Sequence, residues 1–509
     1  MFLHPDNSLR LPGMYQLIAF LFLGGLLIAC GSSDDESTST EPADYRPAYH
    51  YAPAKNWVND PNGLVYLDGE YHLFYQYNPY GDTWGHMSWG HAVSQDLKTW
   101  EELPVALKEY SNADSTETMI FSGCVVVDSL NTSGFFAPGF RKGMVAIYTS
   151  HVYKGEEGLA QHQSLAYSAD KGRTWTYYGK NPVLDIGMKD FRDPNVFRYE
   201  DKWKMVVAKP HEYSVQIYES TDLKEWKLLS EFGKMGDMAK IWECPSLFKV
   251  PVEDTLPEKW VMMISSAAED TAFTGMQYFV GDFDGKKFTP QKQKEVFRVD
   301  LGKDFYAAIP FHNLPPTQPQ PIMMGWVNNW AYANKIPTEG FRGMFSLPRA
   351  LSLYQQDGVY RLRQRPIFKD KLPVRTLTMK ASDLAAGVIM KLDGNSYRVD
   401  LTVELAEAKD FEIKLLDNET ETSLLSYEIA TGKMTFDRTK SGKVAFHEKF
   451  SSVESMTVMP QNGELKLAIF VDNSVIEIYA NDGMAVLTDL VYPTKSKGVV
   501  VIGEQRKVE

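Results

Sequence analysis

Trp57-Val-Asn-Asp-Pro-Asn-Gly63 is the stretch of this 509-residue chain from which the fold can best be read. Proline fixes φ, and Asn and Gly tolerate positive φ, so the stretch by itself predicts a turn. An aromatic run, Tyr71-His-Leu-Phe-Tyr-Gln-Tyr77, follows with the alternation of a strand. Two further acidic motifs lie downstream, Arg192-Asp193-Pro194 and Trp242-Glu243-Cys244-Pro245. Three carboxylates beside proline or aromatic residues suggest chemistry on a glycoside.

The composition agrees with a large β-rich protein. The length is sufficient for two or three domains, and the 13% of aromatic residues favours β structure and permits sugar stacking. The formal net charge of −13, without a long basic run, argues against nucleic acid as a partner. Cys124 and Cys244 lack the spacing of a disulfide framework, so buried thiols are expected, although pairing in an oxidising compartment stays open.

The N-terminal segment has the features of an export signal. Residues 15–29 are apolar but too short to favour a spanning helix. The sequence Leu27-Ile-Ala-Cys30 resembles a bacterial lipobox, which predicts a signal peptide over residues 1–29 and lipidation of Cys30. A plain secretory signal and a membrane anchor are the alternatives. Residues 30–44 are rich in Ser, Thr and acidic residues and predict a flexible tether. We therefore expect a bacterial cell-envelope lipoprotein on the surface or periplasmic face of the outer membrane.

The rest of the chain consists of short alternating segments separated by turn residues. From 45 to 350 a turn pattern repeats, in which an Asp-centred turn follows one strand and an aromatic residue begins the next. The copies are Val93–Trp100, Tyr167–Trp175, Tyr218–Trp226 and the weaker Phe279–Phe288. Their separation fits propeller blades with insertions. The polar stretch Gln355-Gln-Asp-Gly358, followed by Pro366 and Pro373, predicts a linker over residues 351–372, and the alternation over 373–509 predicts a β-sandwich.

Seven motifs together resemble glycoside hydrolase family 32, the β-fructosidases. Besides the three acidic motifs they are Phe74–Pro79, Trp89–Ser94, Phe121-Ser-Gly123 and Ser346-Leu-Pro-Arg349, and the stretch Phe470–Gly483 resembles the C-terminal domain of that family. The resemblance covers nearly everything after the tether. It implies an all-β protein, in which a five-bladed β-propeller with an active site on its axis is followed by a C-terminal β-sandwich.

The resemblance also implies roles for the three acids. Asp60 would be the nucleophile, Glu243 the acid/base, and Asp193 the residue that stabilises the transition state. Cleavage of a fructoside builds positive charge at the anomeric carbon, so the site needs an anion and a proton donor for the leaving oxygen.

A second group of residues would contact the terminal fructose, although packing or strand capping is a comparable explanation for each one alone. These candidates are Asn59, Gln76, Trp84, Phe121, Ser122, Arg192 and Trp326. The sequence contains no metal-ligand spacing and no phosphate loop, so neither a metal nor another cofactor is expected.

The leading functional hypothesis is a retaining, exo-acting hydrolase that releases fructose from levan or inulin and also from sucrose. An endo-fructanase and a sucrose-directed invertase are the alternatives within the same class. A surface glycan-binding lipoprotein without turnover is the alternative from another class, and the presence of all three acids argues against it. The expected partners are a fructan or fructo-oligosaccharide and a membrane reached through the lipid on Cys30.

Overall fold

The computed structural model describes residues 45–253, 258–267, 274–367, 373–418, 420–495 and 498–505. The predicted signal peptide, Cys30 and the tether lie outside these residues. Strands dominate the described chain, and its α-helix, α1 (Ala381–Ala386), is a short one. None of the helices in the described segments is long and apolar enough to cross a membrane.

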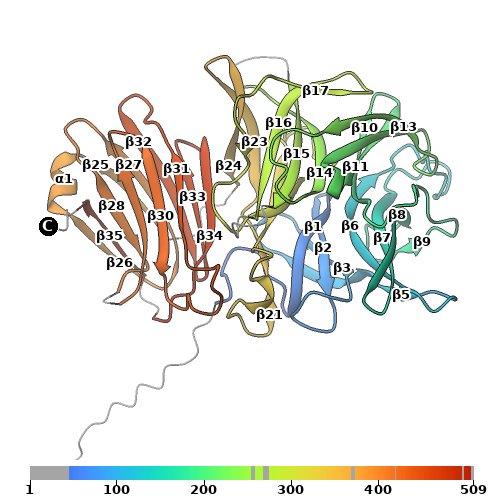
Figure 1. Ribbon diagram of the computed structural model, residues 1–509, viewed down its shortest axis with the longest axis horizontal. Helices are drawn as coiled ribbons and strands as arrows, with labels where there is room; N and C mark the ends of the chain where they lie inside the picture. The colour runs from blue at the N-terminus through green and yellow to red at the C-terminus, as the bar shows by residue number, and fades with distance from the viewer. Residues whose placement is uncertain are drawn as a thin grey trace, which may run out of the picture. The chain divides into compact units, whose positions relative to one another are not determined.

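Five mainly antiparallel sheets follow one another from β1 to β24, and each is a blade of a propeller (Figure 1). Blade 1 contains β1 (Asn56–Leu67), β2 (Glu70–Asn78), β3 (Ser88–Ser94) and β4 (Glu101–Leu107). Blade 2 contains β5 (Tyr110–Ser111), β6 (Glu117–Val127), β7 (Met144–Lys154), β8 (Glu157–Ser168) and β9 (Thr176–Tyr177). Blade 3 contains β10 (Arg192–Tyr199), β11 (Lys202–Lys209), β12 (Ser214–Ser220) and β13 (Lys227–Gly233).

Two further blades complete the propeller. Blade 4 contains β14 (Ile241–Val250), β15 (Lys259–Ala267), β16 (Thr274–Phe283), β17 (Phe288–Pro290) and β18 (Phe297–Arg298). Blade 5 contains β19 (Tyr306–Pro310), β20 (Ile322–Val327), β22 (Met344–Phe345), β23 (Arg349–Gln356) and β24 (Val359–Pro366). The five-bladed propeller expected from the sequence is thus confirmed.

The innermost long strand of each blade lies around a common axis. β1, β6, β10, β14 and β19 contact one another in that order, and β19 contacts β1, which closes the ring. Their middle residues are buried, because each strand is covered by its neighbours in the ring as well as by its own blade. β21 (Phe341–Arg342) adds in parallel to the start of β1, so the end of the propeller is joined to its beginning.

The repeated turn predicted from the sequence occurs in blades 1 to 4, where it connects β3 to β4, β8 to β9, β12 to β13 and β16 to β17. Its aspartate accepts hydrogen bonds from backbone N–H groups that follow it in the turn. The Asp96 carboxylate accepts from Lys98 N at 2.9 Å, and the Asp222 carboxylate accepts from Lys224 N at the same distance. Such side-chain hydrogen bonds stabilise a turn whose backbone N–H groups have no partner on a neighbouring strand.

The segment predicted as a linker, residues 351–372, contains most of β23 and all of β24. β23 pairs with β24 along its length and with β20 at its start, and Leu351, Leu353 and Leu362 are buried. The polar residues that suggested a linker form a hairpin turn at Asp357 and Gly358, both with positive φ. The propeller therefore extends to Pro366.

The C-terminal part is a sandwich of two sheets, as predicted. One sheet contains β25 (Val374–Met379), β27 (Ser396–Glu404), β32 (Glu464–Asp472), β33 (Val475–Ala480) and β34 (Ala485–Leu490). The other contains β26 (Val388–Leu392), β35 (Gly498–Glu504), β28 (Phe411–Leu415), β29 (Thr422–Glu428), β30 (Lys433–Lys440) and β31 (Val453–Thr457).

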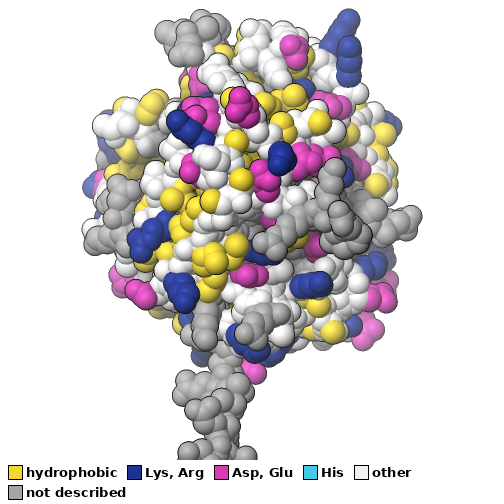
Figure 2. Space-filling model, turned by 90° about the vertical axis from the view of Figure 1, so that its left-hand side faces the viewer, with side chains coloured by type: hydrophobic (Ala, Val, Ile, Leu, Met, Phe, Trp, Pro, Cys, Tyr) yellow, Lys and Arg dark blue, Asp and Glu magenta, His cyan; other side chains and the backbone are white. Residues whose placement is uncertain are grey.

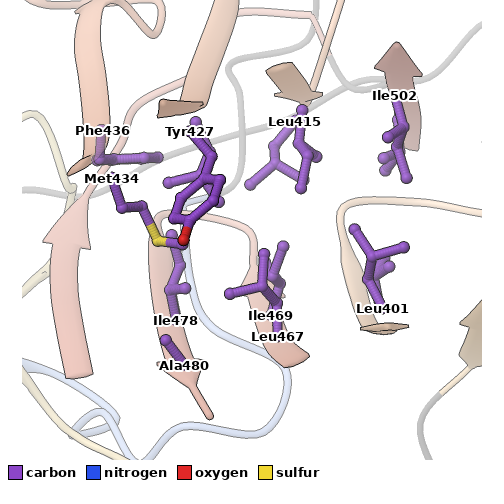
Figure 3. Packing of buried hydrophobic residues seen from close by; sticks show 14 of the residues in the cluster. Leu401, Leu415, Tyr427, Met434, Phe436, Leu467, Ile469, Ile478, Ala480 and Ile502 are labelled. Carbon is purple, nitrogen blue, oxygen red and sulfur yellow. The ribbon is translucent and has the colours of Figure 1, made fainter. Parts of the chain in front are cut away.

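The core of the sandwich lies between its two sheets. Figure 3 shows Leu401, Ile469 and Ile478 of one sheet facing Leu415 and Tyr427 of the other. Each large apolar side chain buried in this way contributes about 1.5–3 kcal/mol to folding. On the face drawn in Figure 2, acidic and basic side chains are interspersed, so the net negative charge forms no single patch there.

A buried polar network joins the propeller to the sandwich. The Arg349 guanidinium is fully buried and donates to Asp300 at 2.8 Å and to Glu477 of β33 at 3.0 Å. His50 bridges two carboxylates of the sandwich, Asp472 at 2.9 Å and Glu477 at 3.1 Å. Because buried charges are tolerated only when they are paired, these contacts fix how the two domains meet.

Candidate active site

The five innermost strands are irregular at the same level of the propeller. Each contains a β-bulge, at which one strand has extra residues relative to its partner. The register shifts between Val58 and Pro61 in β1, Phe121 and Gly123 in β6, Arg192 and Asn195 in β10, Glu243 and Ser246 in β14, and Tyr306 and Ile309 in β19. Because bulges redirect side chains, these five positions can point polar groups at the axis.

The sequence explains three of the bulges. Proline occupies the bulge in β1, β10 and β14 as Pro61, Pro194 and Pro245, at positions where a regular strand would need an N–H donor. Two residues of these bulges, Asp193 and Cys244, have φ values of 64° and 47°. Positive φ at residues other than glycine costs free energy and is concentrated at functional sites.

A cavity of about 490 Å³ opens at this level of the axis. It is lined by Asn59, Asp60, Gln76, Trp84, Phe121, Ser122, His151, Gln161, Asp190, Arg192, Asp193, Lys240, Ile241, Glu243 and Trp330. All three acids proposed from the sequence are therefore brought together, although they come from blades 1, 3 and 4. A larger hollow of about 660 Å³ lies at the opposite ends of β6 and β10, but it lacks these three acids.

Asp60 is held by donors on both of its oxygen atoms. Ser122 Oγ donates to Oδ2 at 2.6 Å, and Asn59 Nδ2 donates to Oδ1 at 2.9 Å. Trp57 Nε1 donates to Asn59 Oδ1 at 2.8 Å and so orients the amide, while the Cys244 thiol lies 3.5 Å from Oδ2. Burial raises the pKa of Asp60, and the hydrogen bonds from Ser122 and Asn59 reduce that rise. The carboxylate is thus fixed in one orientation, with an anionic form that its donors support.

Asp193 lies in the strained bulge of β10. Its own N–H donates to Thr149 Oγ1 at 3.0 Å, and its Oδ2 accepts from Cys244 N at 2.9 Å. Burial raises the pKa of Asp193 to about 7, since the nearby Arg192 guanidinium only partly offsets the loss of solvent and the Glu243 carboxylate adds repulsion. Near neutral pH this group can therefore accept or donate a hydrogen bond to a ligand hydroxyl.

Glu243 has a partner on each of its carboxyl oxygens. Oε1 accepts from Arg192 Nε at 3.2 Å and from Arg192 Nη2 at 3.0 Å. Oε2 accepts from the Tyr306 hydroxyl at 2.6 Å. Arg192 is positioned in turn by Gln161 at 3.2 Å and by Asp190 at 2.9 Å. Both carboxyl oxygens of Glu243 are therefore held in place by donors within the cavity.

The structure places the predicted contact residues in two groups. Asn59, Gln76, Trp84, Phe121, Ser122 and Arg192 line the cavity. Trp326 differs from the prediction, because it is fully buried and its ring packs against Trp57 and Trp330, with centroids 5.9 and 4.7 Å apart. Trp330, four residues later, lines the cavity instead. Trp326 therefore supports an aromatic wall and does not form its surface.

Several lining residues were missed by sequence reasoning. His151, Gln161, Asp190, Lys240 and Ile241 belong to no motif used above, and Tyr306 was missed as the partner of Glu243. Asp190 could have been found from its place two residues before Arg192. His151 on β7 and Gln161 on β8 lie opposite each other, and only the register of the two strands reveals this.

Both cysteines of the described residues are buried, as expected. Cys124 is fully buried in the core between blades 2 and 3, and Cys244 lies beneath the acids. They are unpaired, so the alternative of a disulfide is excluded.

A β-propeller in which two buried carboxylates and a third, partly exposed one converge at one end of the axis has the arrangement of a glycoside hydrolase. The chain belongs to glycosyl hydrolases family 32. Residues 50–366 match the N-terminal domain of that family, and residues 359–509 match its C-terminal domain. The resemblance inferred from the motifs is confirmed.

Similar relatives include a levanase and an exo-inulinase. A levanase of Bacillus subtilis (strain 168) is 43% identical over 497 residues, which cover 94% of this chain and 71% of the relative. An extracellular exo-inulinase of Aspergillus awamori is 39% identical over 488 residues, covering 88% and 90%. The crystal structure of exo-inulinase from the same organism matches with a TM-score of 0.81 at 36% identity, covering 91% of this chain and 96% of that one.

Proposed function

We propose that this chain is a retaining, exo-acting β-fructosidase that removes terminal fructose from levan or inulin and also hydrolyses sucrose. The convergence of Asp60, Asp193 and Glu243 in one cavity carries the proposal. Its support from relatives is the similarity to a levanase and to exo-inulinases. Pro61, Pro194 and Pro245 pack below the acids around a space of only about 10 Å³, so the cavity is nearly closed along the axis beneath them.

The first step transfers the fructosyl group to Asp60. A carboxylate oxygen of Asp60 attacks the anomeric carbon, the bond from that carbon to the leaving oxygen breaks, and Glu243 gives its proton to that oxygen. Ser122 and Asn59 hold the attacking carboxylate in place. The product of this step is an ester between Asp60 and fructose, together with the shortened chain or glucose.

The second step releases fructose. Water attacks the same anomeric carbon from the side vacated by the leaving group, Glu243 takes the proton of that water, and the ester bond to Asp60 breaks. Two displacements restore the original configuration. Asp193 accepts hydrogen bonds from sugar hydroxyls as positive charge builds on the ring, and its contact with Cys244 N keeps it facing the cavity.

The alternatives differ in products or in turnover. An endo-fructanase would need a cavity open at both ends for an internal segment, and a sucrose-directed invertase would favour sucrose over polymers. A glycan-binding protein without turnover would have no need for a hydrogen-bonded nucleophile and a partnered acid in one site.

A time course of products tests the proposal. The protein without its first 30 residues is incubated with levan, inulin and sucrose, with Asp60→Asn as the control. Free fructose from the polymers at the earliest times, absent in the variant, is the expected result. Oligosaccharides among the first products would show endo action in place of exo action. Binding of the polymer without any turnover would contradict the proposed catalysis.

We further infer that the chain is an outer-membrane lipoprotein anchored through Cys30. The apolar segment 15–29 and the lipobox-like Leu27–Cys30 support this, as does a polymeric substrate that must be met outside the cell. Labelling of cells with a fatty acid tests it. Label in the full chain that is lost in Cys30→Ser is expected, and an unlabelled full chain would contradict the anchor.

A further inference from the structure

The most exposed aromatic side chains of the described residues are linked by contacts to a loop that lines the active-site cavity. Four rings, Tyr80, Trp84, Tyr110 and Tyr177, are exposed by 71, 42, 37 and 37% respectively, more than the other aromatic side chains that the structure describes. A single exposed ring needs no explanation, whereas the grouping of all four points to a binding surface. These residues are called the aromatic strip below.

The strip begins at the cavity itself. Trp84 is a lining residue, and its ring meets Phe121 edge to face at 6.2 Å. The backbone N–H of Trp84 donates to Asn334 Oδ1 at 2.9 Å, which ties this loop to blade 5. Two residues later, His86 packs edge to face against Tyr80 at 5.2 Å. The most exposed ring of the strip, Tyr80, therefore packs on a residue that follows the lining residue Trp84 by two positions.

The strip continues from blade 1 onto blade 2. His86 Nδ1 lies 2.7 Å from the carboxylate of Glu109, and Glu109 is followed directly by Tyr110. The ring of Tyr110 contacts that of Tyr177 at 5.6 Å. The Tyr177 hydroxyl donates to the carbonyl of Lys108 at 2.8 Å and accepts from its N–H at 2.9 Å. Rings fixed in this way lose little conformational freedom when a ligand binds.

We propose that the aromatic strip is an accessory binding site for those sugar units of a polymeric substrate that lie outside the cavity. Aromatic faces cover the apolar side of sugar rings, and His86 and Glu109 between them offer groups that bind hydroxyls. The continuity of the strip with Trp84 identifies the occupant as the chain whose end is in the cavity. The inference rests on the proposed function, which supplies the polymer as substrate.

The strip is tested by comparing the activity on a polymer with the activity on sucrose. Sucrose is small enough to fit in the cavity without reaching the strip beyond Trp84. Tyr80→Ala and Tyr110→Ala are each expected to lower the ratio of kcat/KM on levan or inulin to kcat/KM on sucrose by about 3- to 10-fold, mainly through KM. Tyr80→Trp, which keeps a stacking face, is expected to restore the ratio. Leu130→Ala is the matched control, because Leu130 is 64% exposed but borders the hollow at the opposite end of the axis.

Binding without turnover separates this inference from the proposed function. In the Asp60→Asn background, the migration of the protein is measured in native gels that contain levan or inulin. Retardation that is lost in the double variant Tyr80→Ala/Tyr110→Ala supports the strip. Unchanged retardation, or an unchanged polymer-to-sucrose ratio, overturns it. If the wild-type protein hydrolyses neither substrate, the proposed function fails, and the gel result still decides whether the strip binds a polymer.

Discussion

At the scale of single residues, the chemistry depends on how donors are shared among the three acids. Asp60 receives the Ser122 hydroxyl and the Asn59 amide, and Asp193 receives the Cys244 N–H. Glu243 lies between Arg192 and Tyr306. Each acid is thereby given a different environment, which is how one cavity assigns different roles to groups of the same type.

Ser122→Ala is expected to move the acidic limb of the rate profile to higher pH. In the wild-type protein the hydrogen bond from Ser122 lowers the pKa of Asp60, so the variant has a higher pKa at this carboxyl. Asp60 must be ionised to attack, and a higher pH is then needed to ionise it. A loss of kcat/KM of about 10-fold is expected at the optimum, close to the value of one hydrogen bond to a charged group. The pH dependence of kcat/KM on sucrose measures both effects.

The control for this variant is Ser164→Ala, which removes another buried hydroxyl of blade 2, one that bonds to Ser150. An unshifted acidic limb in Ser122→Ala, or an equal shift in the control, would contradict the role of Ser122.

Asp193→Asn is expected to stabilise the protein in alkaline solution while abolishing activity. The folded pKa of Asp193, about 7, is above its ordinary value of 3.8, so the wild-type protein loses stability as pH rises from about 4 to about 7. Asparagine does not ionise, and the variant therefore escapes this loss. A gain of about 1–2 kcal/mol at pH 8, vanishing near pH 4, is expected from urea unfolding.

Asp284→Asn provides the opposite case. The pKa of this surface carboxylate is lowered by backbone N–H groups of Lys287 and Lys286, so its loss should destabilise the protein at pH 8. A stability difference in Asp193→Asn that does not change with pH would show that the buried charge is not responsible.

The acids themselves could be predicted from the sequence, because each stands in a short motif with proline or an aromatic residue. Tyr306 could not, since nothing in its flanking sequence distinguishes it from a core tyrosine. Trp326 and Trp330 show the same limit. Both belong to one aromatic-rich stretch and both pack against Trp57, and only the folded chain shows that Trp326 is fully buried while Trp330 faces the cavity.

At the scale of elements, the bulges of the innermost strands place the site. Gly123 in β6 lies where a Cβ would come within 2.1 Å of the Ile147 carbonyl oxygen on the neighbouring strand. The absence of a side chain at this position lets β6 approach β7 at the bulge and so brings Ser122 to Asp60.

Gly123→Ala is therefore expected to lower both stability and activity. The contact is with backbone, which cannot move aside as a flexible side chain would, so a cost of about 1–3 kcal/mol is expected together with a displaced Ser122. Gly179→Ala is the control, because nothing lies within 4 Å of a Cβ there. Thermal unfolding and kcat on sucrose measure the outcome, and wild-type values for Gly123→Ala would contradict this explanation of the bulge.

The elements were predicted with uneven success, for physical reasons. The repeated Asp turn marked four blades because side-chain hydrogen bonds make that turn visible in the sequence. Blade 5 uses the Asp357-Gly358 hairpin instead, and its polar turn was read as a linker although Leu351 and Leu362 on either side are buried. The bulges remained hidden, since they depend on pairing between strands.

At the scale of the whole molecule, the sandwich is joined to the propeller by charged groups buried far from water. Arg349 and His50 of the propeller side meet Glu477 of the sandwich. Such a network fixes one arrangement of the two domains, because breaking any pair leaves an unpaired buried charge. We infer that the sandwich stabilises the propeller.

This network predicts a bounded pH range of stability. Burial lowers the pKa of His50, but hydrogen bonds to Asp472 and Glu477 outweigh it and raise that pKa to about 9. Since the ordinary value is 6.5, the contribution of His50 is complete below pH 6.5 and is lost between about 6.5 and 9. Burial raises the pKa of Glu477, but Arg349 and His50 lower it to about 2, so its contribution is lost as pH falls from 4.5 towards 2.

His50→Gln is expected to be less stable than the wild-type protein at pH 6, by about 1–3 kcal/mol, and to lose less stability between pH 6.5 and 9. Urea unfolding across that range measures the slope. His447→Gln, at a part-exposed histidine of the sandwich, is the control and should keep the wild-type slope. Parallel pH profiles for His50→Gln and the wild-type protein would contradict the role of the network.

The proposed mechanism requires fructose to pass through a covalent ester on Asp60. The most direct test uses Glu243→Gln with a fructoside whose leaving group needs no protonation, so that the ester forms but lacks the base for its hydrolysis. Peptide mass spectrometry of the quenched protein is expected to find one fructosyl unit on the peptide that contains Asp60. A fructosyl unit on another residue, or turnover of that fructoside without any adduct, would contradict the mechanism.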